Sequence, residues 1–365
     1  MNPKGNEFQI TMLGASGVGK TTLLLAMYEK LADIAKDIDF KLIPDEETKN
    51  ILDKYLEQLQ SLQNQMRADE RDKGLQGTKA IAGPDSLPKY VFDLVYKNTK
   101  MRLVFRDYPG GYLTSKDQTE REFVKKLIQE SYGVIVTIDT PAMLEPKREN
   151  FQNRKDWDIS KDSGKWHESR NQPKEVLELL KAACANPRNP KLVILAPVKC
   201  ETYVQKIKDK DGNYYVQEKQ PSQKLIAHIQ EKYEPLLAFL QGRSENIAVI
   251  TAPVQTVGCL HFWKYEVEDG NKPRFWFRKT SIDALYEPKN GDQLLRYLLS
   301  FLFKICNDQL LVERSPILRT IRELFGGDET PFGQVVKTFA QSRKENIDGF
   351  TIIQGHPLLF LKRPK

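Results

Sequence analysis

Short apolar runs separated by amphipathic stretches make up much of the chain. Each run is short enough to be a strand that is buried on both faces. The four clearest runs are 8–13 (FQITML), 133–138 (GVIVTI), 191–195 (KLVIL) and 247–251 (IAVIT). Helical spacing of apolar residues marks 22–31, 174–185 and 292–308 instead. Buried strands that alternate with helices predict an α/β fold whose sheet is mainly parallel and covered by helices on both faces, a three-layer sandwich.

Two further patterns lie between the first strand and the second half of the chain. Residues 46–70 carry apolar side chains at helical spacing, which predicts an amphipathic helix. Residues 69–88 are polar and glycine-rich, which is typical of a mobile loop. Residues 90–96 and 101–106 have the composition of two strands, with a tight turn at 97–100 between them.

The rest of the chain is predicted to decorate this core. The polar stretch 146–172 has the composition of a surface insertion, and Asp211-Gly212 and Asp269-Gly270 are typical turns of two hairpins. Pro316 is expected to begin a further helix in the C-terminal tail. We expect one domain over residues 1–312 and a small C-terminal extension over 313–365. Its insertions are expected near residues 34–88, 145–173, 202–222 and 259–285.

Composition narrows the class of protein without naming a function. The 365 residues are 40% hydrophobic and 29% charged, as in a soluble globular chain with a sizeable core. The net charge of +7 permits contact with nucleic acid but does not indicate it. The four cysteines form no CxxC pair, and the most apolar stretch, 294–305, is interrupted by Arg296 and Lys304. We therefore expect a cytoplasmic protein with no membrane span.

A complete GxxxxGK[ST] motif follows the first predicted strand and precedes the first predicted helix. In such a loop, backbone N–H groups and the helix N-terminus bind phosphates, Lys20 reaches the β- and γ-phosphates, and Thr21 binds Mg²⁺. A glycine-rich turn that carries a lysine by chance is the alternative, but the strand and helix on either side favour a nucleotide site. The predicted nucleotide contacts are Gly14, Ser16, Gly17, Val18, Gly19, Lys20, Thr21 and Thr22.

The second motif, DxxG, begins where the predicted strand 101–106 ends. Asp107 could hold the Mg²⁺ shell, and the backbone N–H of Gly110 could contact the γ-phosphate and move when that phosphate leaves. An ordinary turn that begins with an aspartate is the alternative. The place of the motif, after both a phosphate loop and a strand, favours the metal role.

The sequence Val198-Lys199-Cys200-Glu201 follows the predicted strand 191–195. In GTPases an [NT]KxD motif at such a place recognises guanine, because its carboxylate accepts hydrogen bonds from two guanine donors. Val198 replaces the motif's Asn or Thr, Lys199 keeps its lysine, and Glu201 keeps the carboxylate one methylene further out. Adenine offers no equivalent donor pair. A surface loop with a solvated lysine and glutamate is the alternative interpretation.

Over about residues 9–307 these motifs resemble the TRAFAC-class GTPases, and most of all divergent bacterial members from signalling or conflict systems. The resemblance implies a P-loop NTPase fold, binding of GTP and GDP, dependence on Mg²⁺ and a two-state switch. It implies phosphate contacts and catalysis by Lys20 and Gly110, and metal binding by Thr21 and Asp107. It also implies base contacts by Lys199 and Glu201, and by Ala252 in Thr251-Ala252-Pro253, where the family has a base-contacting SAK-like loop. It implies γ-phosphate sensing by Thr78. Thr78 could equally be an ordinary loop residue.

One departure from the family pattern bears on catalysis. Many small GTPases place a water-orienting glutamine directly after DxxG, where this chain has Gly111 followed by Tyr112. We therefore expect slow hydrolysis that a protein partner or self-association completes. A GTP-hydrolysing switch is the first hypothesis, an ATP-dependent P-loop ATPase the second, and a nucleotide-binding scaffold with little turnover the third. The insertion 146–172 and the helix before the switch loop are possible partner surfaces, or solvated decoration.

Overall fold

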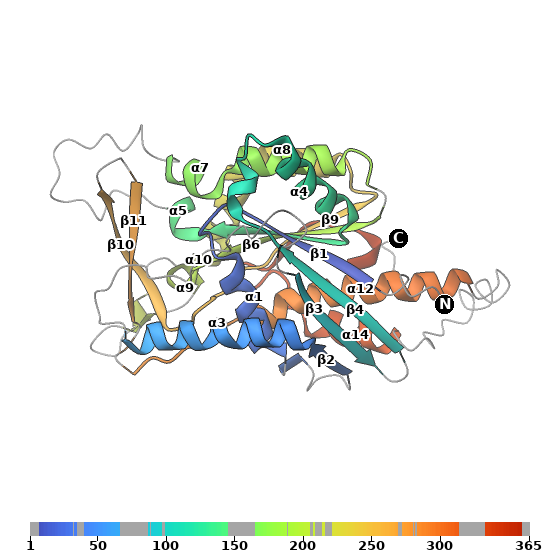
Figure 1. Cartoon of the computed structure of the whole chain (residues 1–365), viewed down its shortest axis with the longest axis horizontal. Coiled ribbons are helices and arrows are strands. Elements are labelled where there is room, and N and C mark those ends of the chain that lie inside the picture. The colour runs from blue at the N-terminus through green and yellow to red at the C-terminus, as the bar shows by residue number, and fades with distance from the viewer. Residues whose placement is uncertain are drawn as a thin grey trace.

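An eight-stranded mixed sheet forms the centre of the computed structural model, in the order β12-β9-β6-β5-β1-β4-β3-β2 (Figure 1). The structure describes residues 7–31, 33–34, 40–65, 87, 89–96, 99–144, 165–187, 189–204, 207–208, 214–215, 221–268, 272–279, 281, 283–313 and 333–359. The central strands are parallel: β1 (Glu7–Leu13), β4 (Thr99–Asp107), β5 (Gly133–Asp139), β6 (Lys191–Val198) and β9 (Ile247–Thr251). The prediction of an α/β fold with a mainly parallel sheet is confirmed.

Antiparallel strands extend the sheet at both edges. β3 (Lys89–Tyr96) forms a hairpin with β4, as the sequence predicted, and β2 (Phe40–Pro44) pairs with β3. At the opposite edge, β12 (Thr351–Gln354) pairs antiparallel with β9. Residues 40–44 and 351–354 therefore belong to the main sheet, although the sequence pattern assigned them to an insertion and to a C-terminal extension.

Helices cover both faces of the sheet, because strand residues alternate between two apolar clusters. Ile194 and Ile250 lie in one cluster, whereas Val193 and Val249 lie in the other. The first face packs against α1 (Lys20–Glu29), α12 (Gly291–Glu313) and α14 (Gly333–Ser342), and the second against α4 (Gln118–Glu130), α8 (Pro173–Cys184) and α11 (Glu234–Gln241). Figure 1 shows α4 and α8 at the top of the molecule, and α1, α12 and α14 lower down, at about the level of β3 and β4. The three layers position the carboxyl ends of the parallel strands at one edge.

The remaining elements lie in the connections. The long helix α3 (Glu46–Gln65) contacts α1, β2 and β3, which agrees with the predicted amphipathic helix. Two separate hairpins are confirmed: β7 (Ile207–Lys208) with β8 (Tyr214–Tyr215), and β10 (Leu260–Glu268) with β11 (Lys272–Lys279). The shorter helices are η2 (Gly110–Leu113), α5 (Thr140–Leu144), α7 (Lys165–Asn171), α9 (Glu201–Val204), α10 (Pro221–Lys232) and η4 (Pro357–Leu359).

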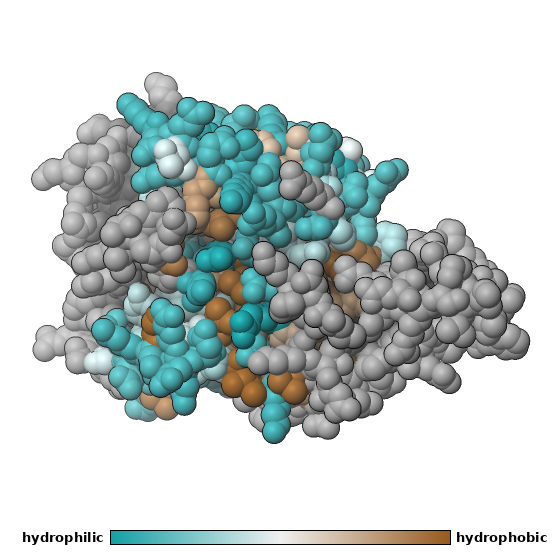
Figure 2. All heavy atoms as spheres, turned by 45° about the vertical axis from the view of Figure 1, so that its right-hand side comes forward, coloured by the Kyte–Doolittle hydropathy of each residue, from teal (hydrophilic) through white to brown (hydrophobic). Residues whose placement is uncertain are grey.

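Apolar side chains are mostly enclosed by these layers. Figure 2 shows that the described residues on one face are largely hydrophilic, with hydrophobic residues gathered in smaller groups. The exposed large apolar side chains among the described residues, Ile43, Leu285 and Ile347, are far apart in the sequence. Within the described ranges, no helix combines the length and apolarity that crossing a membrane requires.

Candidate functional site

The segment between β1 and α1, residues 14–21, is called the glycine loop below. Gly17 and Gly19 have φ angles of 75° and 114°, in the region that favours glycine, and Gly19 caps the N-terminus of α1 without a side-chain hydrogen bond. Ser16 and Gly17 are exposed, while Val18 and Lys20 are buried. The loop therefore has an open side at Ser16 and Gly17, and it leads directly into the N-terminus of α1.

The Lys20 ammonium group lies inside the glycine loop. Its Nζ donates hydrogen bonds to the carbonyl oxygens of Gly14, at 3.0 Å, and Ala15, at 3.3 Å. Its described ion pair is with Asp107 Oδ1, 4.0 Å away. Burial lowers the pKa of Lys20, and the charge of Asp107 opposes that shift. A buried cation held by these three groups is suited to binding an anion at the loop.

Thr21 and Asp107 meet although 86 positions separate them in the sequence. The parallel register of β1 and β4 pairs Met12 with Asp107, which places the end of β4 beside the start of the glycine loop. Thr21 Oγ1 donates a 3.0 Å hydrogen bond to Asp107 Oδ2. A hydroxyl and a carboxylate are oxygen donors that suit Mg²⁺, so these residues fit the predicted metal role.

Gly110 packs directly against the glycine loop. A Cβ atom built at Gly110 would overlap Ser16 N, Ser16 Cα and Ala15 C, so only glycine allows this approach. A Cβ atom built at Gly111 has no heavy atom within 4 Å among the described residues. The two glycines of the Asp107–Gly111 motif thus differ: the first is enclosed by the loop and the second faces open space.

Lys199 lies against the other side of the glycine loop. A Cβ atom at Gly19 would be 3.4 Å from Val198 Cγ2 and 4.0 Å from Lys199 Cε. Lys199 has a φ of 55°, and its Nζ donates a 2.9 Å hydrogen bond to Asp139 Oδ2. Sequence reasoning missed Asp139, a fully buried residue at the end of β5. Its position at the carboxyl end of a buried parallel strand was the available signal.

Glu201 is buried and forms hydrogen bonds with the segment after β9. Its Oε1 accepts two 3.1 Å hydrogen bonds, from the backbone N–H groups of Val257 and Gly258. Burial raises the pKa of the Glu201 carboxyl, and these backbone donors oppose the shift. Ala252, which follows β9, is also buried, and its N–H donates to Leu195 O of β6 at 2.9 Å. The predicted base-contacting residues therefore follow two neighbouring parallel strands, β6 and β9, but Glu201 also has hydrogen-bond partners that the sequence did not reveal.

The end of the predicted surface insertion is packed against this site. Helix α7 buries Trp166, His167 and Asn171, whereas Glu168 and Ser169 are exposed, so one side of this helix is packed rather than solvated. Asn171 Oδ1 accepts from Asp139 N at 2.7 Å, and its Nδ2 donates to Asp139 O at 3.1 Å. Arg170, which sequence reasoning did not select, reaches the glycine loop: a Cβ atom at Gly17 would be 3.6 Å from its Nη1.

Two of the residues predicted for the site, Thr22 and Thr78, have no described contact that adds to the geometry of the glycine loop. Thr22 is half-buried in the first turn of α1, directly after Thr21. Thr78 lies outside the described residues, as does most of the predicted loop 69–88. The structure therefore brings together Lys20, Thr21, Asp107 and Gly110 on one side of the glycine loop.

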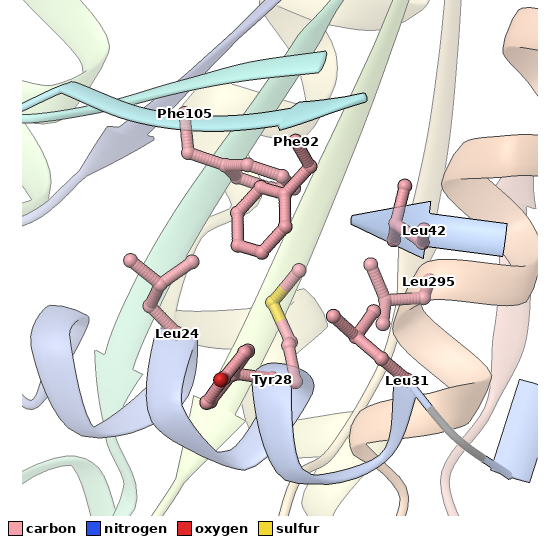
Figure 3. A pocket seen from close by; sticks show the side chains of 8 residues that line it. Leu24, Tyr28, Leu31, Leu42, Phe92, Phe105 and Leu295 are labelled. Atoms are coloured by element: carbon pink, nitrogen blue, oxygen red, sulfur yellow. The ribbon is translucent and has the colours of Figure 1, made fainter. Parts of the chain in front are cut away.

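A separate apolar pocket lies between α1, the β2–β4 edge of the sheet and α12 (Figure 3). In Figure 3 the rings of Tyr28, Phe92 and Phe105 stand near Leu24, Leu42 and Leu295. Among the residues that line this pocket, Tyr28 carries a hydroxyl group, which donates a 3.1 Å hydrogen bond to Asp53 Oδ1. This apolar lining contrasts with the charged residues around the glycine loop, and a phosphate group would gain no charged partner from it.

No protein-family model and no curated protein matches the chain.

Proposed function

We propose that the protein is a molecular switch that binds and hydrolyses GTP with Mg²⁺ and acts on a protein partner. The observation that carries the proposal is the contact between Thr21 and Asp107, with Lys20 Nζ 4.0 Å from the same carboxylate. A phosphate-binding loop, a cation and a metal-binding pair are the parts from which P-loop enzymes position a triphosphate. The resemblance to TRAFAC-class GTPases supports the same assignment.

Each residue has a role in this proposal. The N–H groups of residues 14–21 and Lys20 bind the phosphates, while Thr21 and Asp107 would hold Mg²⁺. The metal, when bound, offsets negative charge on the phosphates. Gly110, which contacts Ser16, is placed to respond to the γ-phosphate, and Thr78 is its proposed partner in the switch. Hydrogen exchange across 69–88 should fall with a non-hydrolysable GTP analogue relative to GDP if that loop is the switch.

Guanine is the proposed base because Lys199 and Glu201 follow β6 beside the glycine loop. A carboxylate has two oxygens, and the two loop bonds of Glu201 use only Oε1. Oε2 is therefore proposed to accept the guanine donors. A second candidate is an ATP-dependent ATPase or a low-turnover scaffold. The hydrogen bonds of Glu201 to Val257 and Gly258 favour it, because they give this residue a structural role that does not involve guanine.

The test is the affinity for fluorescent GTP and ATP analogues with and without Mg²⁺, for the wild type, Thr21→Ala and Asp107→Asn. The proposal expects tighter binding of GTP than ATP, and a Mg²⁺ dependence that both variants lose. Tighter binding of ATP would move the protein to the ATPase class. Absence of nucleotide binding by the folded wild type would reject the proposal.

A further inference from the structure

Arg170 approaches the glycine loop from its open side. Its Nη1 is 3.6 Å from the position that a Cβ atom at Gly17 would occupy. Ser16 and Gly17 are the exposed residues of the loop, whereas Lys20 lies buried on its inner side. The guanidinium therefore adds a second positive charge at the loop, from a direction that Lys20 does not cover.

The backbone beside Arg170 is held firmly. The next residue, Asn171, forms a two-way amide contact with the main chain of Asp139 at the end of β5. Asp139 also accepts from Lys199 Nζ at 2.9 Å and, through Oδ1, from Ala142 N at 3.1 Å. Because β5 is the direct neighbour of β1 in the sheet, this network fixes the end of α7 relative to the glycine loop.

The other end of α7 is held by apolar packing. Trp166 forms a small buried cluster with Ala142 of α5 and with Phe262 and Phe277 of the β10–β11 hairpin. The helix is therefore held at both ends, by hydrogen bonds at Asn171 and by this cluster at Trp166. Arg170 stands on a fixed support rather than on a free surface loop, which lowers the entropy cost of placing its side chain.

We propose that Arg170 is an internal arginine finger: it contacts the triphosphate bound at the glycine loop and stabilises the charge that develops during hydrolysis. This inference rests on the proposed function. The planar guanidinium offers paired N–H donors that match phosphate oxygens, which a lysine cannot reproduce. An arginine supplied from within the chain removes part of the need for an arginine from a partner.

The reaction that Arg170 would assist is a simple hydrolysis. The water oxygen forms a bond to the γ-phosphorus, and the bond from that phosphorus to the bridging oxygen breaks. The electron pair of the broken bond stays with the diphosphate, and the water proton passes to the released phosphate and the solvent. Arg170 supplies positive charge at the phosphates but does not orient the attacking water. Turnover can therefore still depend on a partner that supplies a water-orienting group.

The experiment compares the wild type, Arg170→Ala and Arg170→Lys with the control Lys174→Ala. Lys174 lies nearby on α8, its side chain is 80% exposed, and its described ion pair is with Glu168 at 3.7 Å. Three quantities are measured: affinity for a non-hydrolysable GTP analogue, formation of the complex with GDP and aluminium fluoride, and the single-turnover rate of GTP hydrolysis. Urea unfolding checks that every variant is folded.

For Arg170→Ala we expect analogue affinity within about threefold of wild type, loss of the aluminium fluoride complex, and hydrolysis about 10³-fold slower. Arg170→Lys should behave like the alanine variant, and Lys174→Ala like the wild type. The inference is overturned if Arg170→Ala and Lys174→Ala hydrolyse GTP and form the fluoride complex equally well, or if the wild type forms no such complex. A wild type that binds no nucleotide would instead reject the proposed function, and the inference with it.

Discussion

Substitution of Glu201 by alanine and by glutamine separates its structural role from the proposed recognition of guanine. Its Oε1 accepts two backbone hydrogen bonds at 3.1 Å, from Val257 and Gly258, and the residue is only 4% exposed. Alanine removes both acceptor interactions and leaves the two N–H groups without their partner. Glutamine keeps an acceptor oxygen for them but replaces the other carboxylate oxygen with an amide that donates.

The expected loss of stability follows from these contacts. A hydrogen bond to a charged group contributes about 1.5–3 kcal/mol. Burying the carboxylate costs part of that gain, in agreement with the raised pKa of Glu201. We therefore expect Glu201→Ala to lower the free energy of unfolding by about 3 kcal/mol, near the lower bound for two such bonds. Glu201→Gln should lower it by about 1 kcal/mol, because a neutral acceptor remains.

The glutamine variant is then the informative one for nucleotide choice. The NH2 group of its amide cannot accept hydrogen bonds from the guanine N–H groups. The Kd for GTP should therefore rise at least about tenfold, a loss of about 1.4 kcal/mol in binding free energy, with little change for ATP. Urea unfolding gives the stabilities, and titration of fluorescent GTP and ATP analogues gives the affinities. Wild-type stability in Glu201→Ala would refute the structural role. Equal losses of GTP and ATP affinity in Glu201→Gln would refute guanine selection.

Three further predictions concern Gly110, Gly111 and His167. Gly110→Ala should lower the free energy of unfolding by about 1–3 kcal/mol, because its Cβ overlaps the glycine loop. The control Gly111→Ala should stay within about 0.5 kcal/mol, because its Cβ meets open space among the described residues, and equal urea midpoints for the two variants would contradict this packing. Gly111→Gln should raise the single-turnover rate of GTP hydrolysis at least about tenfold if water orientation is the missing device, and an unchanged rate would point to another deficit. Burial, with a contribution from the charge of Lys232, lowers the pKa of His167 to about 4 from 6.5, so the unfolded chain binds more protons between these values. Stability should therefore rise with pH from about 4 to 6.5, with a smaller slope in His167→Gln, and equal slopes in thermal unfolding would contradict this assignment.

The pH prediction also agrees with the hydrogen bonds of α7. Asn171 Oδ1 accepts from Asp139 N, so the other end of the amide is its NH2 group. That group lies 3.1 Å from His167 Nδ1, which must then be an acceptor in a neutral ring. Protonation of Nδ1 would place its N–H donor against the NH2 donor of Asn171. This would weaken the contact between His167 and Asn171, which lies beside Arg170 in the sequence. Acidification should therefore act on the site as well as on stability.

Hydrophobic patterning was sufficient for the central sheet but not for its edges. The strands β5, β6 and β9 are mostly apolar and are buried on both faces, so their sequence alone predicts core strands. β2 has exposed residues in alternation, and β12 is half-buried, so neither carries the signal of a core strand. Both gain their place from pairing with a strand that is distant in the sequence, β2 with β3 and β12 with β9.

The candidate site was predictable where a motif lies in one contiguous stretch. The glycine loop and Asp107 were found in this way, and their contact follows from the parallel register of β1 and β4. Asp139 had a signal in its place at the end of a buried strand, but its hydrogen bond with Lys199 is not encoded locally, and neither is the approach of Arg170 to Gly17. The structural bonds of Glu201 to the segment after β9 are equally non-local.

The central claim is that residues 14–21 bind a nucleoside triphosphate, and the Lys20→Ala variant tests it most directly. Lys20 Nζ contacts the carbonyl oxygens of Gly14 and Ala15 inside the loop, where the phosphates are proposed to bind. Equilibrium titration with fluorescent GTP and ATP in Mg²⁺ should show that the wild type binds GTP more tightly than ATP. A folded Lys20→Ala variant should bind GTP at least about tenfold more weakly. Unchanged affinity in that folded variant would contradict the account.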